Sequence, residues 1–216
     1  MNTVLRDRLA RIADELALAL SSAQLDSLLA YLDLLVRWNA TYNLTAVQRP
    51  ADMLAQHLAD CLAIVPPLRR LLGEPLAGRL LDVGSGAGLP GAVLAIVAPK
   101  AAVLCVDKVG KKAAFIRQVA AELGLANLRV EHARVEALKT GDFDLIVSRA
   151  FSSLVELVSL TAPHLASNGL WLALKGKRPD AEIDAVAPIA DVFHVEPLIV
   201  PELNAQRCLV WMRRRQ

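Results

Sequence analysis

Cysteine and aromatic residues are scarce in this sequence, and its longest uncharged stretch is broken by glycine and proline. The three cysteines, Cys61, Cys105 and Cys208, are far apart and form no C-x-x-C pair. This spacing argues against a zinc ribbon or a disulfide framework and is typical of a reducing compartment, so we expect a cytoplasmic protein without bound metal. Residues 83–99 carry no charge, but four glycines and two prolines interrupt them, which excludes a membrane span.

Neither sign of charge dominates the composition. The chain has 24 Lys and Arg against 22 Asp and Glu, a formal net charge of +2. This balance excludes a protein coated with nucleic acid but allows one basic face. The basic excess lies after residue 78, where 17 basic residues accompany 14 acidic ones. With 55% hydrophobic and only 4% aromatic residues, we expect a folded protein rich in helices.

The first 78 residues have the pattern of a helical extension. Leucine and isoleucine recur every three or four positions from residue 5 to residue 20, which predicts an amphipathic helix. Ser21 and Gln24 resemble a capping box at the start of a second helix. A third helix is expected at about 51–65, with Pro66 and Pro67 ending it.

From residue 79 to residue 216 the pattern changes to strands that alternate with helices. Such alternation predicts a mainly parallel sheet covered on both faces, in one α/β domain. We expect seven strands at 80–83, 102–106, 128–130, 143–147, 170–174, 192–195 and 208–212, with helices at 89–97, 111–123, 154–165 and 181–190.

A glycine-rich loop follows the first expected strand and opens a helix. It contains Gly84, Ser85 and Gly86 within the sequence LDVGSGAG. Glycines there let the backbone turn tightly and approach a ligand. Asp107 ends the next strand, 23 residues after Gly84, where a carboxylate can accept hydrogen bonds from ribose hydroxyls. Together these features predict a site for a nucleotide-like cofactor.

Asp82 bears on which cofactor that is. Its carboxylate lies two residues before the first glycine, where it would repel a pyrophosphate. S-adenosylmethionine has no phosphate and carries an ammonium and a sulfonium, so this interpretation favours it over NAD. The alternative interpretation is a strand-end carboxylate that caps the following loop.

Several segments, taken in order along nearly the whole chain, resemble the ribosomal RNA small-subunit methyltransferase G family. The loop ending Leu89-Pro90-Gly91 is characteristic, because general methyltransferases lack it. The matching segments are Trp38-Asn39, Tyr42-Asn43-Leu44-Thr45, His57-Leu58 with Asp60 and Leu62, DVGSGAGLPG at 82–91, Ser148-Arg149-Ala150-Phe151, and Leu174-Lys175-Gly176.

The resemblance implies an S-adenosylmethionine-dependent enzyme that methylates the N7 atom of a guanine in the 530 loop of 16S ribosomal RNA, within the small ribosomal subunit. It also implies a Rossmann-like class I fold with an N-terminal helical extension. Carried over by position, cofactor contacts fall at Gly84, Leu89, Val135, Glu136 and Arg149, with Val135 and Glu136 near the adenine. In one departure from the family, Cys208 stands after Arg207, where a histidine is usual.

The expected chemistry needs no general base. The N7 atom of guanine has a free in-plane lone pair, so methylation removes no proton and the enzyme must only align the reacting atoms. The sequence accordingly shows no Ser-His-Asp or Cys-His arrangement. We expect structural or surface roles for the four histidines, which are His57, His132, His164 and His194.

Arg149 is the charged residue most clearly placed for function. It follows an apolar strand, at the edge of the sheet where such folds bind ligands. Its guanidinium could position the carboxylate of the cofactor or a phosphate of the substrate; the alternative is an internal salt bridge. Trp38 and Tyr42 could stack a base, although their helical spacing also suits a core position.

Two basic clusters are expected to hold the RNA backbone. Both follow carboxyl ends of strands, where cations would neutralise phosphates without reading the sequence, and the alternative is a solvated charged face. Two other functions remain open at this point: an NAD-dependent oxidoreductase and a non-catalytic ribosome-binding factor. The clusters comprise Lys108, Lys111 and Lys112 after the second strand and Lys175, Lys177 and Arg178 after the fifth.

Overall fold

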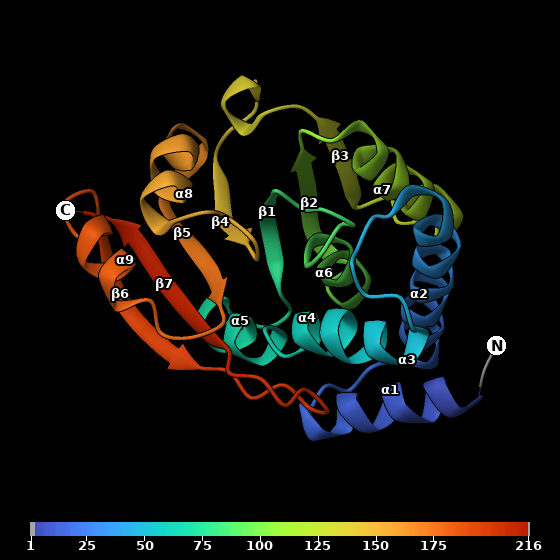
Figure 1. Cartoon of the computed structure of the whole chain (residues 1–216). Coiled ribbons are helices and arrows are strands. Elements are labelled where there is room, and N and C mark those ends of the chain that lie inside the picture. Colours follow the sequence, from blue (N-terminus) through green and yellow to red (C-terminus); the bar gives the residue numbers. More distant parts are fainter. Residues whose placement is uncertain (1–2, 216) are drawn as a thin grey trace.

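A seven-stranded sheet forms the centre of the molecule, with strand order β3-β2-β1-β4-β5-β7-β6 (Figure 1). The computed structural model describes residues 3–215. Strands β1 to β5 run parallel, and β7 pairs antiparallel with both β5 and β6. The expected seven-stranded, mainly parallel sheet is therefore confirmed. The strands are β1 (Ala77–Val83), β2 (Lys100–Asp107), β3 (Leu128–His132), β4 (Phe143–Ser148), β5 (Leu165–Lys175), β6 (Ala190–Pro197) and β7 (Cys208–Arg214).

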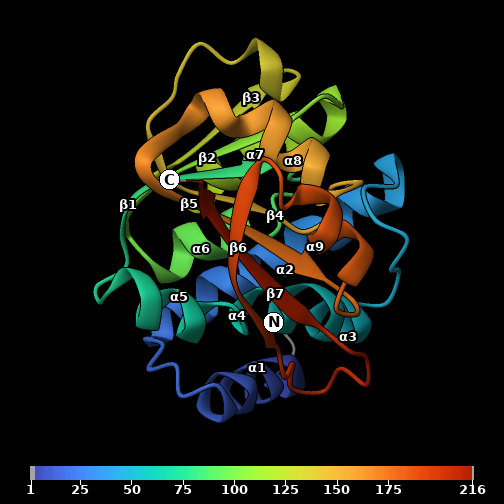
Figure 2. The ribbon, with the colours of Figure 1, turned by 90° about the vertical axis from the view of Figure 1, so that its left-hand side faces the viewer.

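Helices cover both faces of the sheet, which explains why its central strands are mostly apolar on both faces. On one face, α6 (Gly91–Val97) and α7 (Gly110–Glu122) share a core with the N-terminal helices. On the other face, α8 (Leu154–Thr161) and α9 (Asp180–Val186) pack on alternate residues of the same strands. Figure 2 views the molecule from the side of β6 and β7. Residues 3–215 contain no helix of the length and apolarity that a membrane crossing requires.

The order of the strands reverses between β1 and β4. After β1, the chain builds β2 and β3 on one side and then crosses to build β4 and β5 on the other. In open α/β sheets, ligands bind at such a switch point, beyond the carboxyl ends of the strands. The topology therefore places the site at the ends of β1, β2, β4 and β5.

The N-terminal extension is helical, as expected, and its first two helices are α1 (Thr3–Glu15) and α2 (Ser22–Tyr42). The predicted capping box is present, since Ser21 Oγ accepts from the Gln24 backbone N–H and the Gln24 side chain accepts from that of Ser21. The Tyr31 hydroxyl donates to the Ala87 carbonyl at 2.8 Å, which ties α2 to the glycine loop.

The expected third helix differs from the structure. It runs through α3 (Pro50–Met53), a π-helical segment η1 (Leu54–Ala59) and α4 (Asp60–Leu62). The two prolines then lie in the first turn of a new helix, α5 (Val65–Leu72). Proline is favoured there because the first N–H groups of a helix have no intrahelical acceptor. The proline pair therefore begins a helix, and the prediction that it only ends one was wrong.

Other boundaries also differ from the prediction. The helix expected at 154–165 ends at Thr161, because Pro163 cannot continue it; a short 3₁₀ turn, η3 (Ala162–His164), follows. Strand β5 consequently begins at Leu165, five residues earlier than expected. Helix α9 ends at Val186, before Pro188, and not at residue 190.

Candidate active site

The glycine loop connects β1 to α6 and has an unusual backbone. Gly84, Gly86 and Gly88 adopt φ values of 67°, 59° and 79°, which favour glycine because a Cβ would be strained there. A Cβ built on Gly84 would meet no protein atom within 4 Å. The space beside Gly84 is thus open to a ligand, which the loop backbone can approach closely.

Ser85 and Asp107 hold this loop in place. Ser85 Oγ is buried and donates to the Asp82 carbonyl at 2.8 Å, so this side chain braces the loop. The Asp107 carboxylate accepts two backbone hydrogen bonds of 2.8 Å, from the N–H of Gly86 to Oδ2 and from that of Val109 to Oδ1. Asp107 therefore fixes the loops that follow β1 and β2 relative to each other.

A cavity of about 390 Å³ opens beside these loops, within the size range of small-molecule sites. It brings together several predicted cofactor residues from the ends of β1 and β2 and from the 3₁₀ turn η2 (Val135–Ala137). Ser85, Gly86, Leu89 and Arg149 are not among its lining residues. The predicted residues that line it are Gly84, Asp107, Lys108, Lys112, Val135 and Glu136.

The cavity is also lined by residues that were not predicted from the sequence. Arg134 precedes η2, and Phe151 and Ser152 follow β4. Phe151 belongs to the segment Ser148–Phe151, so the sequence held a signal for it. Arg134 had none, because it lies in an exposed loop without a motif.

Asp82 does not face this cavity. It is only 1% exposed, and its Oδ2 accepts from the Gly91 backbone N–H at 2.8 Å, at the start of α6. Burial raises its pKa from 3.8 to about 7, because a carboxylate without water is disfavoured. The structure thus supports the alternative interpretation, in which Asp82 holds the loop. The argument that its charge selects the cofactor was wrong.

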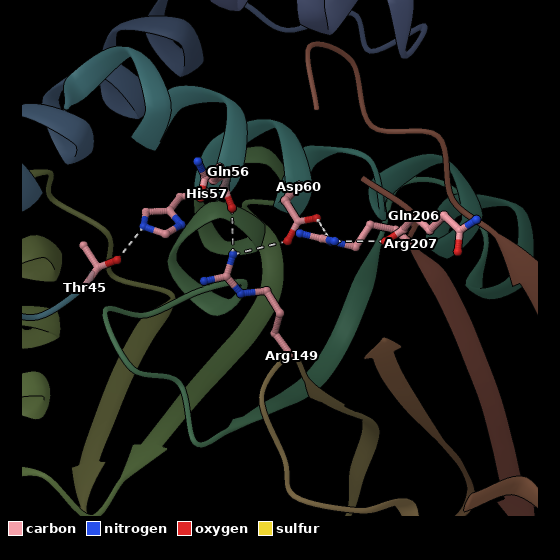
Figure 3. A network of polar contacts seen from close by, with 7 residues as sticks. All are labelled: Thr45, Gln56, His57, Asp60, Arg149, Gln206 and Arg207. Carbon is pink, nitrogen blue, oxygen red and sulfur yellow. Dashed lines mark hydrogen bonds and ion pairs between the residues drawn. The ribbon is translucent and has the colours of Figure 1, made fainter. Parts of the chain in front are cut away.

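Arg149 lies at the end of β4 and forms an internal salt bridge, as one interpretation of the sequence held. Its Nη1 donates to the Gln56 carbonyl at 3.2 Å and to Asp60 Oδ2 at 3.3 Å. Arg207 Nε donates to the other oxygen of Asp60 at 2.8 Å. Figure 3 shows Asp60 between the two arginines. Three elements that are distant in the sequence therefore meet at one buried carboxylate.

The histidines lie outside the 390 Å³ cavity, as far as the described residues show. His57 is buried, and its Nε2 lies 2.9 Å from Thr45 Oγ1 (Figure 3). Burial, together with the positive charge of Arg149, lowers its pKa to about 4. His132 and His164 bind the backbone carbonyls of Lys108 and Thr140. Residues 3–215 also contain no group of three or more His, Cys, Asp or Glu side chains arranged for a metal ion.

Comparison with known proteins identifies the family. A family model described as rRNA small subunit methyltransferase G matches residues 24–210. The chain belongs to this family. A ribosomal RNA small subunit methyltransferase G from Leptothrix cholodnii is 56% identical, and the match covers 97% of this chain and 96% of that protein. The protein of that name from Methylibium petroleiphilum is 54% identical, with coverage of 94% and 91%.

Solved structures with the same fold include proteins named as methyltransferases. The glycopeptide N-methyltransferase MtfA, complexed with S-adenosylmethionine, matches with a TM-score of 0.60 at 13% identity, covering 73% of this chain and 94% of that one. TrmN from Thermus thermophilus matches with a TM-score of 0.57 at 19% identity, with coverage of 75% and 53%. At these identities the likeness establishes the Rossmann-like methyltransferase fold. The oxidoreductase and the non-catalytic factor find no support among these matches.

The first basic cluster lies only partly at the cavity. Lys108 and Lys112 line the cavity, whereas Lys111 Nζ donates to the Tyr42 carbonyl at 2.6 Å. Tyr42 is 44% exposed, and its ring lies 5.1 Å from that of Trp38. Trp38 packs against Phe115 with 5.6 Å between ring centroids, so Trp38 is partly buried against the core.

The second cluster is partly neutralised by acidic neighbours. Lys175 Nζ donates to Glu182 Oε2 at 2.8 Å, and Arg178 Nε donates to Asp180 Oδ1 at 2.6 Å. Lys177 is exposed. Cys208, which stands where the family usually has histidine, is buried at the start of β7.

Proposed function

We propose that this protein transfers the methyl group of S-adenosylmethionine to the N7 atom of a guanine in the 530 loop of 16S ribosomal RNA. The observation that carries the proposal is the 56% identity, over nearly the full length, to a protein named ribosomal RNA small subunit methyltransferase G. The glycine loop and the cavity beside it are consistent with this activity.

The residues around the cavity fit S-adenosylmethionine. The open space beside Gly84 admits the cofactor against the loop backbone. Asp107 keeps further lone pairs that can accept from ribose hydroxyls, and Val135 and Glu136 lie where the adenine would be held. Ser85, Gly86 and Leu89 act by shaping the loop. When bound, the cofactor supplies an electrophilic methyl group.

The protein contributes alignment to the reaction. Because the N7 lone pair needs no deprotonation, placing it in line with the methyl carbon and the sulfur is sufficient. Arg149 lies at the end of β4, where it can position the substrate, with its guanidinium held by Asp60. No step calls for proton transfer by an imidazole.

The substrate would be held as part of the small ribosomal subunit, in the cytoplasm. Lys108 and Lys112 line the cavity, Lys111 precedes Lys112 on α7, and Lys175, Lys177 and Arg178 follow β5. In this proposal both groups contact RNA phosphates. In this proposal the helical extension ends at residue 78 and serves the catalytic part that follows it, because its Gln56 and Asp60 hold Arg149.

Calorimetric titration tests the cofactor directly. The protein should bind S-adenosylmethionine and its demethylated product, and it should not bind NAD. Binding of NAD without binding of S-adenosylmethionine would refute the proposed function.

A further inference from the structure

A second cavity, of about 280 Å³, lies between the helical extension and the ends of β4 and β5. It shares no lining residue with the 390 Å³ cavity. Figure 3 shows several of its polar groups converging from both parts of the chain. The side chains that give it its character are Gln56, His57, Asp60, Arg149, Lys175 and Arg207.

The ion pairs within this cavity leave donors unused. Asp60 is 2% exposed, and each of its oxygens accepts from one arginine. Arg149 makes both of its hydrogen bonds through Nη1, and Arg207 uses Nε for Asp60 and Nη1 for the Gln206 carbonyl. Within residues 3–215, Nη2 of both guanidiniums therefore has no hydrogen-bond partner. Unused donors on two held guanidiniums form a ready site for an acceptor.

His57 contributes a further unused group. Its side chain is only 6% exposed, and its Nδ1 is buried without a hydrogen-bond partner among the described residues. Thr45 Oγ1 accepts from the Val47 N–H, so its own proton is free to be donated to His57 Nε2. We assign the neutral tautomer accordingly, with the proton on Nδ1. A buried donor of this kind costs free energy unless a ligand satisfies it.

The charged side chains around the second cavity have a positive balance, which also favours an acceptor that carries negative charge. Arg149, Arg207 and Lys175 bring three positive charges, and Asp60 and Glu182 bring two negative ones. The groups without a partner, Nη2 of the two arginines and Nδ1 of His57, are hydrogen-bond donors. The Asp60 carboxylate already accepts from both arginines. A ligand that fits must therefore offer several acceptor oxygens and a negative charge.

We propose that this second cavity binds a phosphodiester group of the RNA substrate, through Arg149, Arg207 and His57. The inference rests on the proposed function and adds a phosphate subsite to it. The carboxylate of the cofactor offers the same chemistry. The RNA is favoured because the cavity is distinct from the one beside the glycine loop. A bound phosphodiester would also hold the RNA strand close to the end of β4, where Arg149 lies.

The test compares three single variants of the full-length protein. Arg207→Gln removes a donor and a charge, whereas Arg207→Lys keeps the charge without the planar pair of donors. Arg129→Gln is the matched control, because Arg129 is exposed on the edge strand β3 and loses the same charge. Urea unfolding first confirms that each variant is folded. Binding is then measured at several salt concentrations, with small ribosomal subunits from a strain that lacks this methyl group.

We expect Arg207→Gln to weaken subunit binding by roughly 10- to 100-fold, as for a lost hydrogen bond to a charged group. The log–log salt slope should flatten by about 0.7 to 0.9, the value for one phosphate contact. Arg207→Lys should restore the slope but only part of the affinity. Arg129→Gln should match the parent, and S-adenosylmethionine should bind all variants equally.

The two proposals fail in different ways. If Arg207→Gln binds subunits with the affinity and slope of the parent, the phosphate subsite is refuted and the ion pairs are only structural. A selective loss of S-adenosylmethionine affinity in Arg207→Gln would assign the cavity to the cofactor carboxylate and overturn the inference. If the parent itself does not bind the subunits, the proposed substrate is refuted.

Discussion

Replacing Asp107 with alanine should loosen the glycine loop and weaken cofactor binding together. The carboxylate accepts from the backbone N–H groups of Gly86 and Val109, both at 2.8 Å. Alanine removes both acceptors and the proposed contact to ribose. The loop after β1 would then lose its link to the loop that begins α7.

The size of the effect follows from these bonds. A hydrogen bond to a charged group contributes about 1.5–3 kcal/mol, and solvent from the adjacent cavity can replace part of it. We therefore expect Asp107→Ala to lower the free energy of unfolding by about 3 kcal/mol. Cofactor affinity should fall by a further 1–3 kcal/mol, which is roughly 5- to 150-fold. Asp107→Asn keeps one acceptor oxygen and should lose about half as much stability.

Urea unfolding and calorimetry with S-adenosylmethionine measure the two quantities. Asp144→Ala is a matched control, because Asp144 Oδ2 accepts from the Arg79 backbone N–H at 2.7 Å, near the opposite end of the sheet. That variant should lose stability but bind the cofactor normally. An Asp107→Ala protein with the stability and cofactor affinity of the parent would show that these bonds do not organise the site.

Three further predictions concern the loop and the basic cluster. The pKa of Asp82 is raised to about 7, so the free energy of unfolding should fall by up to about 4 kcal/mol as the pH rises from about 4 to 7. Asp82→Asn should flatten that pH dependence when urea unfolding is measured at several pH values. Identical pH profiles for the variant and the parent would contradict this role of Asp82. Gly91→Ala should destabilise by about 1–3 kcal/mol, since its Cβ would overlap Cys105 Sγ and would lie 2.8 Å from Asp82 Oδ2; an unchanged unfolding midpoint would refute the overlap. Neutralising Lys111 and Lys112 should flatten the salt slope of subunit binding by about 1.5, and parallel lines would argue against an RNA contact there.

The sheet was predictable because its strands are short apolar runs between glycine, proline and charged residues. Residues 80–83 and 145–147 are buried, and the local sequence is sufficient to mark them. The ends of elements depended on proline, whose effect differs with position. Pro66 and Pro67 begin α5, whereas Pro163 ends α8.

The candidate site was predictable where one loop supplies it, and not where distant residues meet. Gly84 and Asp107 follow successive strands, so the topology alone brings them together. Arg207 and Asp60 are 147 positions apart, and no local pattern signals their pairing. The direction of Asp82 could not be read from sequence either, because a carboxylate beside a glycine loop can face the ligand or the helix.

Methyl transfer to the ribosome tests the central claim most directly. Small ribosomal subunits from a strain lacking this enzyme are incubated with the protein and S-adenosylmethionine labelled in its methyl group, and the labelled nucleotide is mapped. The account predicts one labelled guanine in the 530 loop of 16S ribosomal RNA, methylated at N7. Label at another nucleotide or another atom, or no label in the RNA, would contradict it.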